Sequence, residues 1–414
     1  MLVVLHCLIA IGFSLLFSIA STVAQDTSLP TVQTHIKISE IAEEMALRRA
    51  VEKALALLEN ASAGSADQRE CFTCHSQALP VLAFTEARSR GFSVKLDNLY
   101  RQTQHTLEHL NRGRENYLQG RGQGGRSDTA GFALWTLSAG QLNSPAITNP
   151  VVDWLFDQQR ESGNWRCSSD RPPSEASHHT TTFVALRGLQ YFALSNQPDR
   201  TQAAFRKARD WLVNTEADDT EDGVFRLLAL HLVRNELSDN GQLVSDALQH
   251  QAANLLIGQQ PDGGWAQKSD MSTDAYATGS VLFALHECNI LKPSDQAWQS
   301  GVHFLLESQL NDGSWYVGSR SEPFQPYYET GFPHGTEDGP VYLYLCHGLG
   351  RDRTGPHTAR GRRTINASWY VHPHMAGGRF IHAHDGWCAP IYRITNCSSK
   401  PTTESTLELR FFFC

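Results

Sequence analysis

The sequence predicts an all-α fold in which paired helices close into a barrel. Three segments of the 414-residue chain align without gaps and share the pattern Gln-x-x-x-Gly-x-Trp. Each segment ends an amphipathic stretch and is followed by a more apolar one, and in both stretches the apolar residues recur at helical spacing. A fixed repeat of this kind is typical of architectures in which neighbouring units bury a shared core.

The repeat unit is about fifty residues long. The glutamines of the three copies lie 100 and 50 residues apart, which implies that one copy has diverged between the first two. The segment 210–225 is the expected place of the diverged copy. The three clear copies are WLFDQQRESGNW at 154–165, NLLIGQQPDGGW at 254–265 and FLLESQLNDGSW at 304–315.

Each repeat predicts one helical hairpin. A glycine at the junction can take the left-handed conformation that ends the first helix. A Ser, Thr or Asp then begins the second helix, because its side-chain oxygen accepts from an otherwise unpaired backbone N–H. The second helices are more apolar, so they are expected to form an inner ring, with the first helices outside. The expected hairpins span 36–90, 95–140, 148–194, 201–236, 243–290 and 294–349.

These repeats resemble those of the squalene-hopene cyclase and protein prenyltransferase superfamily. The resemblance covers about residues 36–335 and rests on three copies in phase. It implies an α/α toroid of six helical hairpins, the fold of the terpenoid cyclase and prenyltransferase type. In that family the repeated Gln and Trp tie the outer helices together. The resemblance therefore implies a structural role for Trp165, Trp265 and Trp315.

Composition and charge exclude one broad class of partner. The chain has 41% hydrophobic and 19% charged residues, which is enough apolar material for a large core. Its formal net charge is −8 and its pI is about 6.1. Nucleic-acid binding needs a basic surface that neutralises phosphates, so no nucleic-acid partner is expected.

The N-terminus predicts export. Residues 1–24 form an apolar run that ends in Thr-Val-Ala, which fits the small-x-small rule for signal cleavage, and residues 25–35 are expected to be a linker. The protein is therefore expected to be periplasmic or secreted. No Lys or Arg precedes the apolar run, so an uncleaved N-terminal membrane anchor is the alternative.

The stretch 71–75 reads Cys-Phe-Thr-Cys-His, the spacing of a c-type haem site. In such a site Cys71 and Cys74 bond to the haem vinyl groups and His75 binds the iron, and the spacing allows all three to lie on one helical turn. A redox disulfide or half of a zinc site uses the same cysteines. Zinc is not expected, because no second ligand pair accompanies the motif. The second axial ligand stays open among His178, His179, Met271 and His334.

The motif and the repeats together resemble exported bacterial proteins that combine a haem c motif with cyclase-like repeats. The resemblance to the cyclases also implies an acidic Asp-x-Asp-Asp motif at the start of an inner helix. This chain keeps Asp128 but has Arg126 and Ser127 where further acids would stand. Asp128 is the candidate general acid, and a helix cap is the alternative interpretation.

A pocket is predicted at the mouth of the barrel. The repeat phase places His75, Asp128 and Asp274 at the same ends of their inner helices. Aromatic faces nearby can contact a carbocation or a planar apolar ligand, while the alternative is an ordinary structured loop. The candidate pocket residues are Asp274, Phe324, Tyr327, Tyr328, Glu329, Phe332 and His334.

The sequence is consistent with two functions. One is an exported squalene-cyclase-like protein that carries covalent haem c, binds an apolar, isoprenoid-like ligand in the barrel and acts as a terpenoid cyclase-like isomerase. The other is a non-catalytic haem-binding scaffold with a redox or ligand-binding role and an electron-transfer partner. The tail, residues 350–414, has neither helical period nor caps and is expected to be irregular.

Overall fold

The computed structural model describes residues 31–238, 241–321 and 330–333, with side chains from residue 43 onward. Over these ranges the chain is all-α, as the sequence predicts, apart from one short antiparallel pair of strands, β1 (Trp265–Ala266) and β2 (Thr273–Asp274). The predicted signal peptide at 1–24, the sixth inner helix within 336–349 and the tail at 350–414 lie outside the described residues.

Six of the described helices bury one face each. They are α2 (Thr31–Gln68), α4 (Leu96–Arg112), α7 (Pro145–Asp157), α9 (Pro198–Asn214), α11 (Gly241–Ile257) and α13 (Gln296–Glu307). In α4 the buried residues Leu99, Thr103, Thr106 and Leu110 recur every three or four positions, so one stripe faces the core. The first described helix, α2, begins at Thr31, inside the segment expected as a linker.

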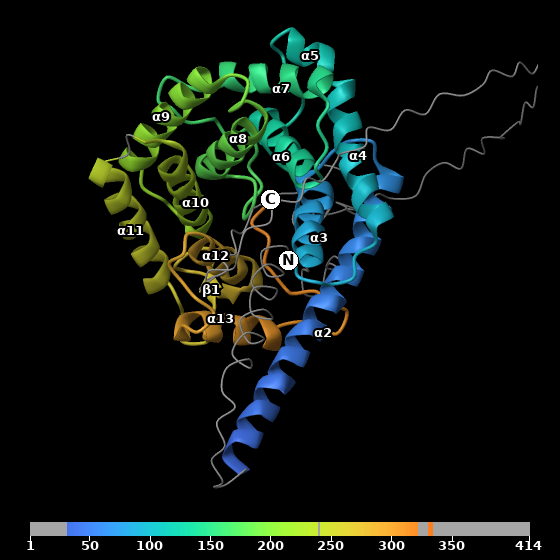
Figure 1. The fold of residues 1–414 in the computed structure, drawn as a ribbon, viewed down its shortest axis with the longest axis vertical. Coiled ribbons are helices and arrows are strands. Elements are labelled where there is room, and N and C mark those ends of the chain that lie inside the picture. Colours follow the sequence, from blue (N-terminus) through green and yellow to red (C-terminus); the bar gives the residue numbers. More distant parts are fainter. Residues whose placement is uncertain (1–30, 239–240, 322–329, 334–414) are drawn as a thin grey trace, which may run out of the picture. The chain divides into compact units, whose positions relative to one another are not determined.

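A second set of helices is buried on nearly all sides. It comprises the π-helical turn η1 (Cys74–Ala78) with α3 (Leu79–Ser89), then α6 (Arg126–Ala139), α8 (His178–Phe192), α10 (Thr220–Glu236) and α12 (Ala275–Glu287). Each packs on the next: α3 on α6, α6 on α8, α8 on α10 and α10 on α12. Figure 1 shows them inside the half-buried helices, with the short α5 (Arg114–Leu118) near α7.

The repeated Trp residues fill equivalent positions. Trp165, Trp265 and Trp315 are each at most 2% exposed. In each case the indole Nε1 donates to the carbonyl of the leucine ten residues earlier, at 2.7, 2.6 and 2.7 Å. The indole therefore fastens the turn of each repeat to the helix that precedes it.

The repeated Gln residues join neighbouring half-buried helices. The Nε2 of Gln159 donates to Ala204 O on α9, and that of Gln259 donates to Ala297 O on α13, both at 2.8 Å. The Nε2 of Gln309 donates at 2.9 Å to Ala50 O on α2, across 259 residues of chain. The last described helix is thus bonded to the first.

The repeated glycines allow these close approaches. Gly263 and Gly313 have φ of 88° and 91°, a region that side chains with a Cβ rarely adopt. A Cβ on Gly263 would stand 2.5 Å from Ser300 O, and one on Gly313 would stand 2.7 Å from the backbone of Lys53. Helix α11 ends at Ile257 and α13 at Glu307. The glycines therefore lie in the turn after each helix and are not the residues that end it.

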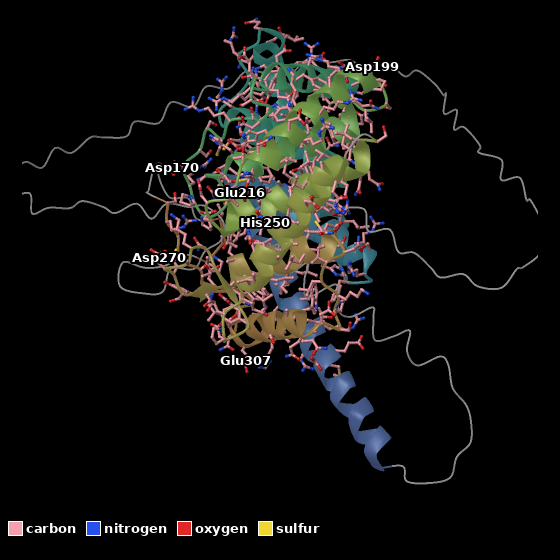
Figure 2. All side chains as sticks on the ribbon, turned by 90° about the vertical axis from the view of Figure 1, so that its left-hand side faces the viewer. Asp170, Asp199, Glu216, His250, Asp270 and Glu307 are labelled. Atoms are coloured by element: carbon pink, nitrogen blue, oxygen red, sulfur yellow. The ribbon has the colours of Figure 1, made fainter. Side chains whose placement is uncertain are left out.

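Charged side chains lie mainly on the outside of the described chain. Among the described helices, none combines the length and the apolar character that a membrane crossing requires. The residues labelled in Figure 2 are all exposed: Asp170, Asp199, Glu216, His250, Asp270 and Glu307.

Candidate functional site

The candidate site lies at the N-terminal ends of the buried helices. The turns that follow the half-buried helices lead into these ends, and several polar side chains are buried there. Cys74 and His75 are in η1, Asp128 is in the first turn of α6 and Glu221 is in the first turn of α10. All four are at most 8% exposed.

The local chain places Cys74 and His75 on one turn. Thr73 caps η1 by accepting from Ser76 N at 3.3 Å, and the N–H of Leu79 donates to Cys74 O, which makes the turn π-helical. Such turns occur often at functional sites. Cys71 lies before the turn and is exposed, contrary to the expectation that both cysteines share one helical turn with His75.

Helix α4 holds the segment that leads into the turn. The Nε2 of His105 lies 3.1 Å from Cys71 O, and the Arg112 guanidinium donates to Glu70 O. The Phe72 ring is buried and stacks obliquely on His109, with ring centroids 6.0 Å apart. Cys71 is therefore fixed through its backbone while its side chain stays near solvent.

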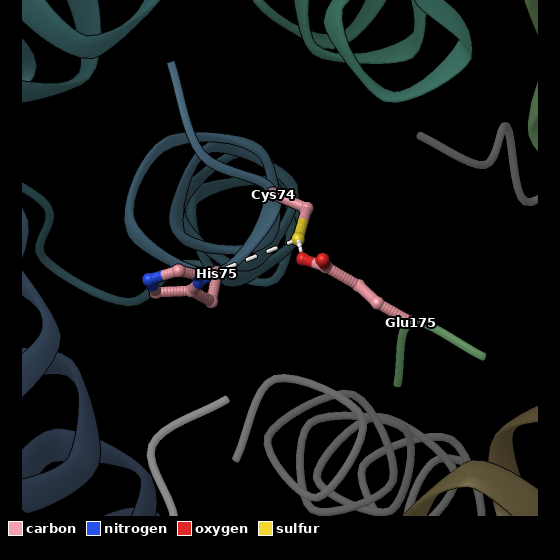
Figure 3. Close-up of side chains that lie close together, drawn as sticks. All are labelled: Cys74, His75 and Glu175. Carbon is pink, nitrogen blue, oxygen red and sulfur yellow. Dashed lines mark hydrogen bonds between the residues drawn. The ribbon is translucent and has the colours of Figure 1, made fainter. Parts of the chain in front are cut away.

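Cys74 and His75 meet a carboxylate from a distant loop, Glu175 (Figure 3). The Cys74 thiol donates to Glu175 Oε1, and Cys74 Sγ lies 4.0 Å from His75 Nδ1. Each of the three residues has one atom able to bind a metal ion, and these three atoms lie within 4.8 Å of one another. Their exposed fractions are 8%, 3% and 5%. Neither the spacing nor the charge pattern of the sequence singled out Glu175.

A short loop holds Glu175 in place. Arg171 N donates to Glu175 O at 2.8 Å and Glu175 N donates to Arg171 O at 3.1 Å, so the loop closes on itself. The Arg171 guanidinium forms an ion pair with Glu175 Oε2. Burial raises the pKa of Glu175, and the charge of Arg171 opposes that rise.

A covalent haem c needs two thiols beside the histidine that binds its iron. Cys74 and His75 supply one of the thiols and the histidine, and they are adjacent, buried and on one turn. The second thioether bond falls to Cys71, whose thiol is at the exposed edge of the site. Among the described residues no disulfide links Cys71, Cys74, Cys167 or Cys288, so the alternative disulfide between Cys71 and Cys74 is not formed in this structure.

Asp128 is not the cap of its helix. Gly125 is the N-cap of α6, and the Asp128 carboxylate instead accepts from Thr181 Oγ1 on α8 and from the backbone and hydroxyl of Ser168, at 3.1 and 3.3 Å. Burial raises the pKa of Asp128, while the hydrogen bond from Thr181 lowers it. Its charge also acts on Glu175, so the two carboxyl groups belong to one electrostatic cluster.

Two of the candidate axial ligands, His178 and His179, interact with other residues. His178 Nδ1 accepts from the backbone N–H of Cys167 at 3.2 Å. His179 stacks on Trp211, with ring centroids 4.6 Å apart, and its Nδ1 lies 3.3 Å from Asp222 Oδ1. Met271 lies in the turn before β2, and His334 lies outside the described residues.

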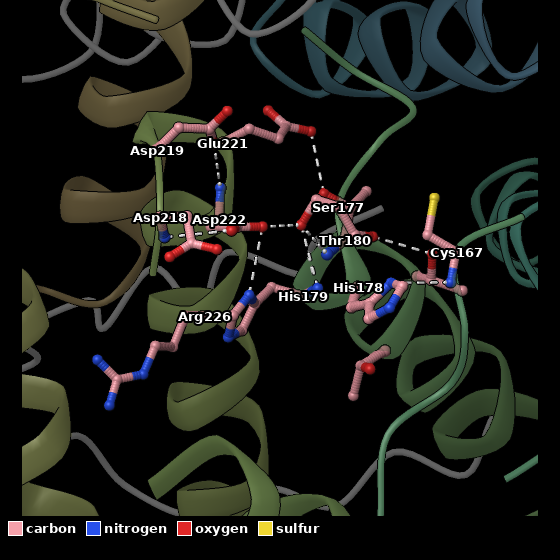
Figure 4. Close-up of polar contacts among 12 residues, drawn as sticks. Cys167, Ser177, His178, His179, Thr180, Asp218, Asp219, Glu221, Asp222 and Arg226 are labelled. Atoms are coloured by element: carbon pink, nitrogen blue, oxygen red, sulfur yellow. Dashed lines mark hydrogen bonds and ion pairs between the residues drawn. The ribbon is translucent and has the colours of Figure 1, made fainter. Parts of the chain in front are cut away.

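A second buried carboxyl group, that of Glu221, lies where α8 and α10 begin (Figure 4). Glu221 accepts from Thr180 Oγ1 at 3.0 Å and from Tyr276 Oη at 2.7 Å. Burial raises its pKa to about 8, so the group is largely protonated at neutral pH. Glu221 lines a small crevice with Tyr276 and Pro173, and Pro173 belongs to the loop that holds Glu175.

Asp274 has a capping role. It is the N-cap of α12 and accepts from Ala277 N and from Gln267 Nε2, both at 2.9 Å. Gln267 also accepts from Arg320, which pairs with Asp219 at 3.0 Å. These contacts join α12 to the start of α10, so Asp274 belongs to the neighbourhood of Glu221.

The predicted aromatic loop is described only in part. Phe332 is 5% exposed, and its neighbours Thr330 and Gly331 lie against Gly64 and Ala61 of α2. This places Phe332 beside the first hairpin, which also carries the Cys-x-x-Cys-His motif. The other candidate residues of this loop, Phe324, Tyr327, Tyr328, Glu329 and His334, lie outside the described residues.

No protein-family model matches this chain, and no curated protein shows significant similarity to it.

Proposed function

We propose that the chain is an α/α toroid of the terpenoid cyclase and prenyltransferase type. In the described part of the chain, five half-buried helices alternate in order with five buried ones, and a sixth half-buried helix, α13, follows them. The bond from Gln309 to Ala50 joins α13 to α2, as the closure of an outer ring requires. The sixth inner helix is expected within 336–349.

We further propose that it is an exported, squalene-cyclase-like protein that carries covalent haem c and binds an apolar, isoprenoid-like molecule in the barrel. One observation carries the cofactor proposal: Cys74 and His75 are buried side by side on a single turn at the N-terminal ends of the buried helices. Cys71 and Cys74 would hold the haem and His75 would bind its iron. Export rests on the apolar segment at 1–24.

When bound, the haem supplies a one-electron redox centre, and the protein then needs an electron-transfer partner. The chain's own residues position the motif. Thr73 caps the turn that carries His75, and His105 fixes the backbone at Cys71. Glu175 and Asp128 add two buried carboxyl groups that interact with each other, and Arg171 pairs with Glu175.

Protein produced with haem-attachment machinery is expected to show a Soret band and one haem per chain that stays on the chain after denaturation. The double variant Cys71→Ser/Cys74→Ser should lose this haem, because no thioether bond can form. Cys288→Ala is the control, since this buried cysteine follows the opposite end of α12. A wild type without a Soret band, or a double variant that keeps covalent haem, contradicts the cofactor proposal.

Isomerisation of an isoprenoid is the second candidate function, with Asp128 as the acid. It is favoured by the burial of Asp128, which raises the pKa of this carboxyl and so helps it to hold a proton. On incubation with squalene, cyclised products are expected from the wild type, and Asp128→Asn should lower their rate at least about 100-fold, the usual effect of losing a general acid. Equal rates in wild type and variant exclude Asp128 as the acid. No product from either favours the non-catalytic, haem-binding scaffold.

A further inference from the structure

The loop 171–175 brings a third type of metal ligand to the Cys-x-x-Cys-His motif. The residues of the motif supply sulfur and imidazole nitrogen, and Glu175 supplies a carboxylate from 101 residues further along the chain. A set of one thiol, one imidazole and one carboxylate suits zinc and the neighbouring transition metals, whereas calcium and magnesium prefer oxygen ligands alone.

The separation of two of the three ligand atoms is close to that around a bound ion. Zinc binds sulfur at about 2.3 Å and nitrogen at about 2.0–2.1 Å, so a tetrahedral site separates these two ligand atoms by roughly 3.6 Å. Cys74 Sγ and His75 Nδ1 are 4.0 Å apart, and the carboxylate oxygen of Glu175 that faces them contacts the sulfur. An ion between the three ligand atoms requires the Glu175 carboxylate to move back from the sulfur, while Cys74 and His75 need little change.

The electrostatics of the cluster favour a cation. A thiolate and a carboxylate together balance a doubly charged ion, and a buried Cys74 thiolate without a cation would be costly. Arg171 binds Glu175 Oε2, which orients Oε1 toward Cys74, much as a residue behind a metal ligand orients it. On binding, the proton of the Cys74 thiol would pass to solvent.

We propose that Cys74, His75 and Glu175 form a site for one divalent transition-metal ion, which the protein binds when no haem is attached to the motif. The site uses the same motif as the proposed haem and so deepens that proposal, while its ligand set differs. It includes Glu175, and it leaves out Cys71, whose side chain is exposed. The fourth position of a tetrahedral site stays open to water or another small ligand.

Cobalt(II) is the probe, because it replaces zinc and absorbs visible light. The full chain, produced in a host without haem-attachment machinery, is titrated with cobalt(II) and followed by absorption. One ion per chain is expected, with a sulfur-to-cobalt charge-transfer band that is absent from Cys74→Ser. Glu175→Gln should weaken cobalt binding at least about 10-fold. Losing a residue that only orients a ligand already lowers metal affinity by about 10-fold or more, and Glu175 is proposed to bind the ion itself. Glu70→Gln, a neighbouring exposed carboxylate, should bind like the wild type.

Unchanged affinity in Glu175→Gln, with circular dichroism showing that the variant is folded, overturns the assignment of Glu175. Absence of a charge-transfer band in the wild type overturns the site itself. The haem proposal fails separately: Glu175→Gln made with haem-attachment machinery should keep its covalent haem, and Cys71→Ser should keep cobalt binding while losing one thioether bond. Loss of cobalt binding in Cys71→Ser would contradict the proposed ligand set.

Discussion

Replacing Trp315 by alanine is expected to lower the free energy of unfolding by about 3–5 kcal/mol, the usual cost of emptying a buried tryptophan site. Trp315 is 2% exposed, and its Nε1 donates to Leu305 O at 2.7 Å. The truncation leaves a cavity and removes the partner of this carbonyl. It also loosens the turn after α13, the helix that Gln309 bonds to α2.

Tyr316→Ala is the matched control, because the neighbouring aromatic ring is 49% exposed. Urea unfolding followed by circular dichroism compares both variants with the wild type, and the control should lie within about 0.5 kcal/mol of it. An equal decrease in the free energy of unfolding of the two variants would show that Trp315 does not stabilise this turn more than an exposed aromatic residue does.

Glu221→Gln is expected to raise the free energy of unfolding at pH 8, although it removes a buried carboxyl group. The carboxyl has a pKa of about 8 in the folded chain and 4.5 as its ordinary value. Between these pH values the folded state keeps a proton that the unfolded state has lost. The free energy of unfolding of the wild type therefore falls as pH rises, by up to about 1.4 kcal/mol per pH unit from this group.

A glutamine at this position is neutral at every pH and can still accept a hydrogen bond from Thr180 or Tyr276. Below pH 4.5 this group should contribute little to the difference in the free energy of unfolding between the two proteins. The difference should grow in favour of the variant toward pH 8. Urea unfolding of both proteins at several pH values checks this. Glu161→Gln is the control, because that side chain is exposed. A gap that stays constant with pH contradicts the raised pKa.

The helical order of the chain was predictable because its signals are local. The spacing of apolar residues marked each hairpin, and the pattern around Gln259, Gly263 and Trp265 recurs wherever the same turn must be built. The structure adds the partners: Trp265 bonds to Leu255 O and Gln259 to Ala297 O. Asp274 was likewise marked as the start of an inner helix, and it is the N-cap of α12.

The site was predictable only in part. Cys74, His75 and Asp128 could be singled out from motif and repeat phase. The partners of Asp128 could not, and the helix-cap interpretation was wrong because Ser168 and Thr181, from the next hairpin, donate to its carboxylate. Glu221 carries a weak signal, since an acid in the first turn of a buried helix has to be hydrogen-bonded or protonated.

Residues 71–75 on their own specify the spacing of two cysteines and a histidine, because neighbouring positions on a chain are held within a few ångströms by covalent geometry. Only the tertiary structure decides which further groups meet them. Glu175 reaches Cys74 because the packing of α6 on α8 and on η1 carries the loop 171–175 to the start of the first buried helix. That meeting across 101 residues depends on burial and on the ion pair with Arg171, and no local pattern encodes either.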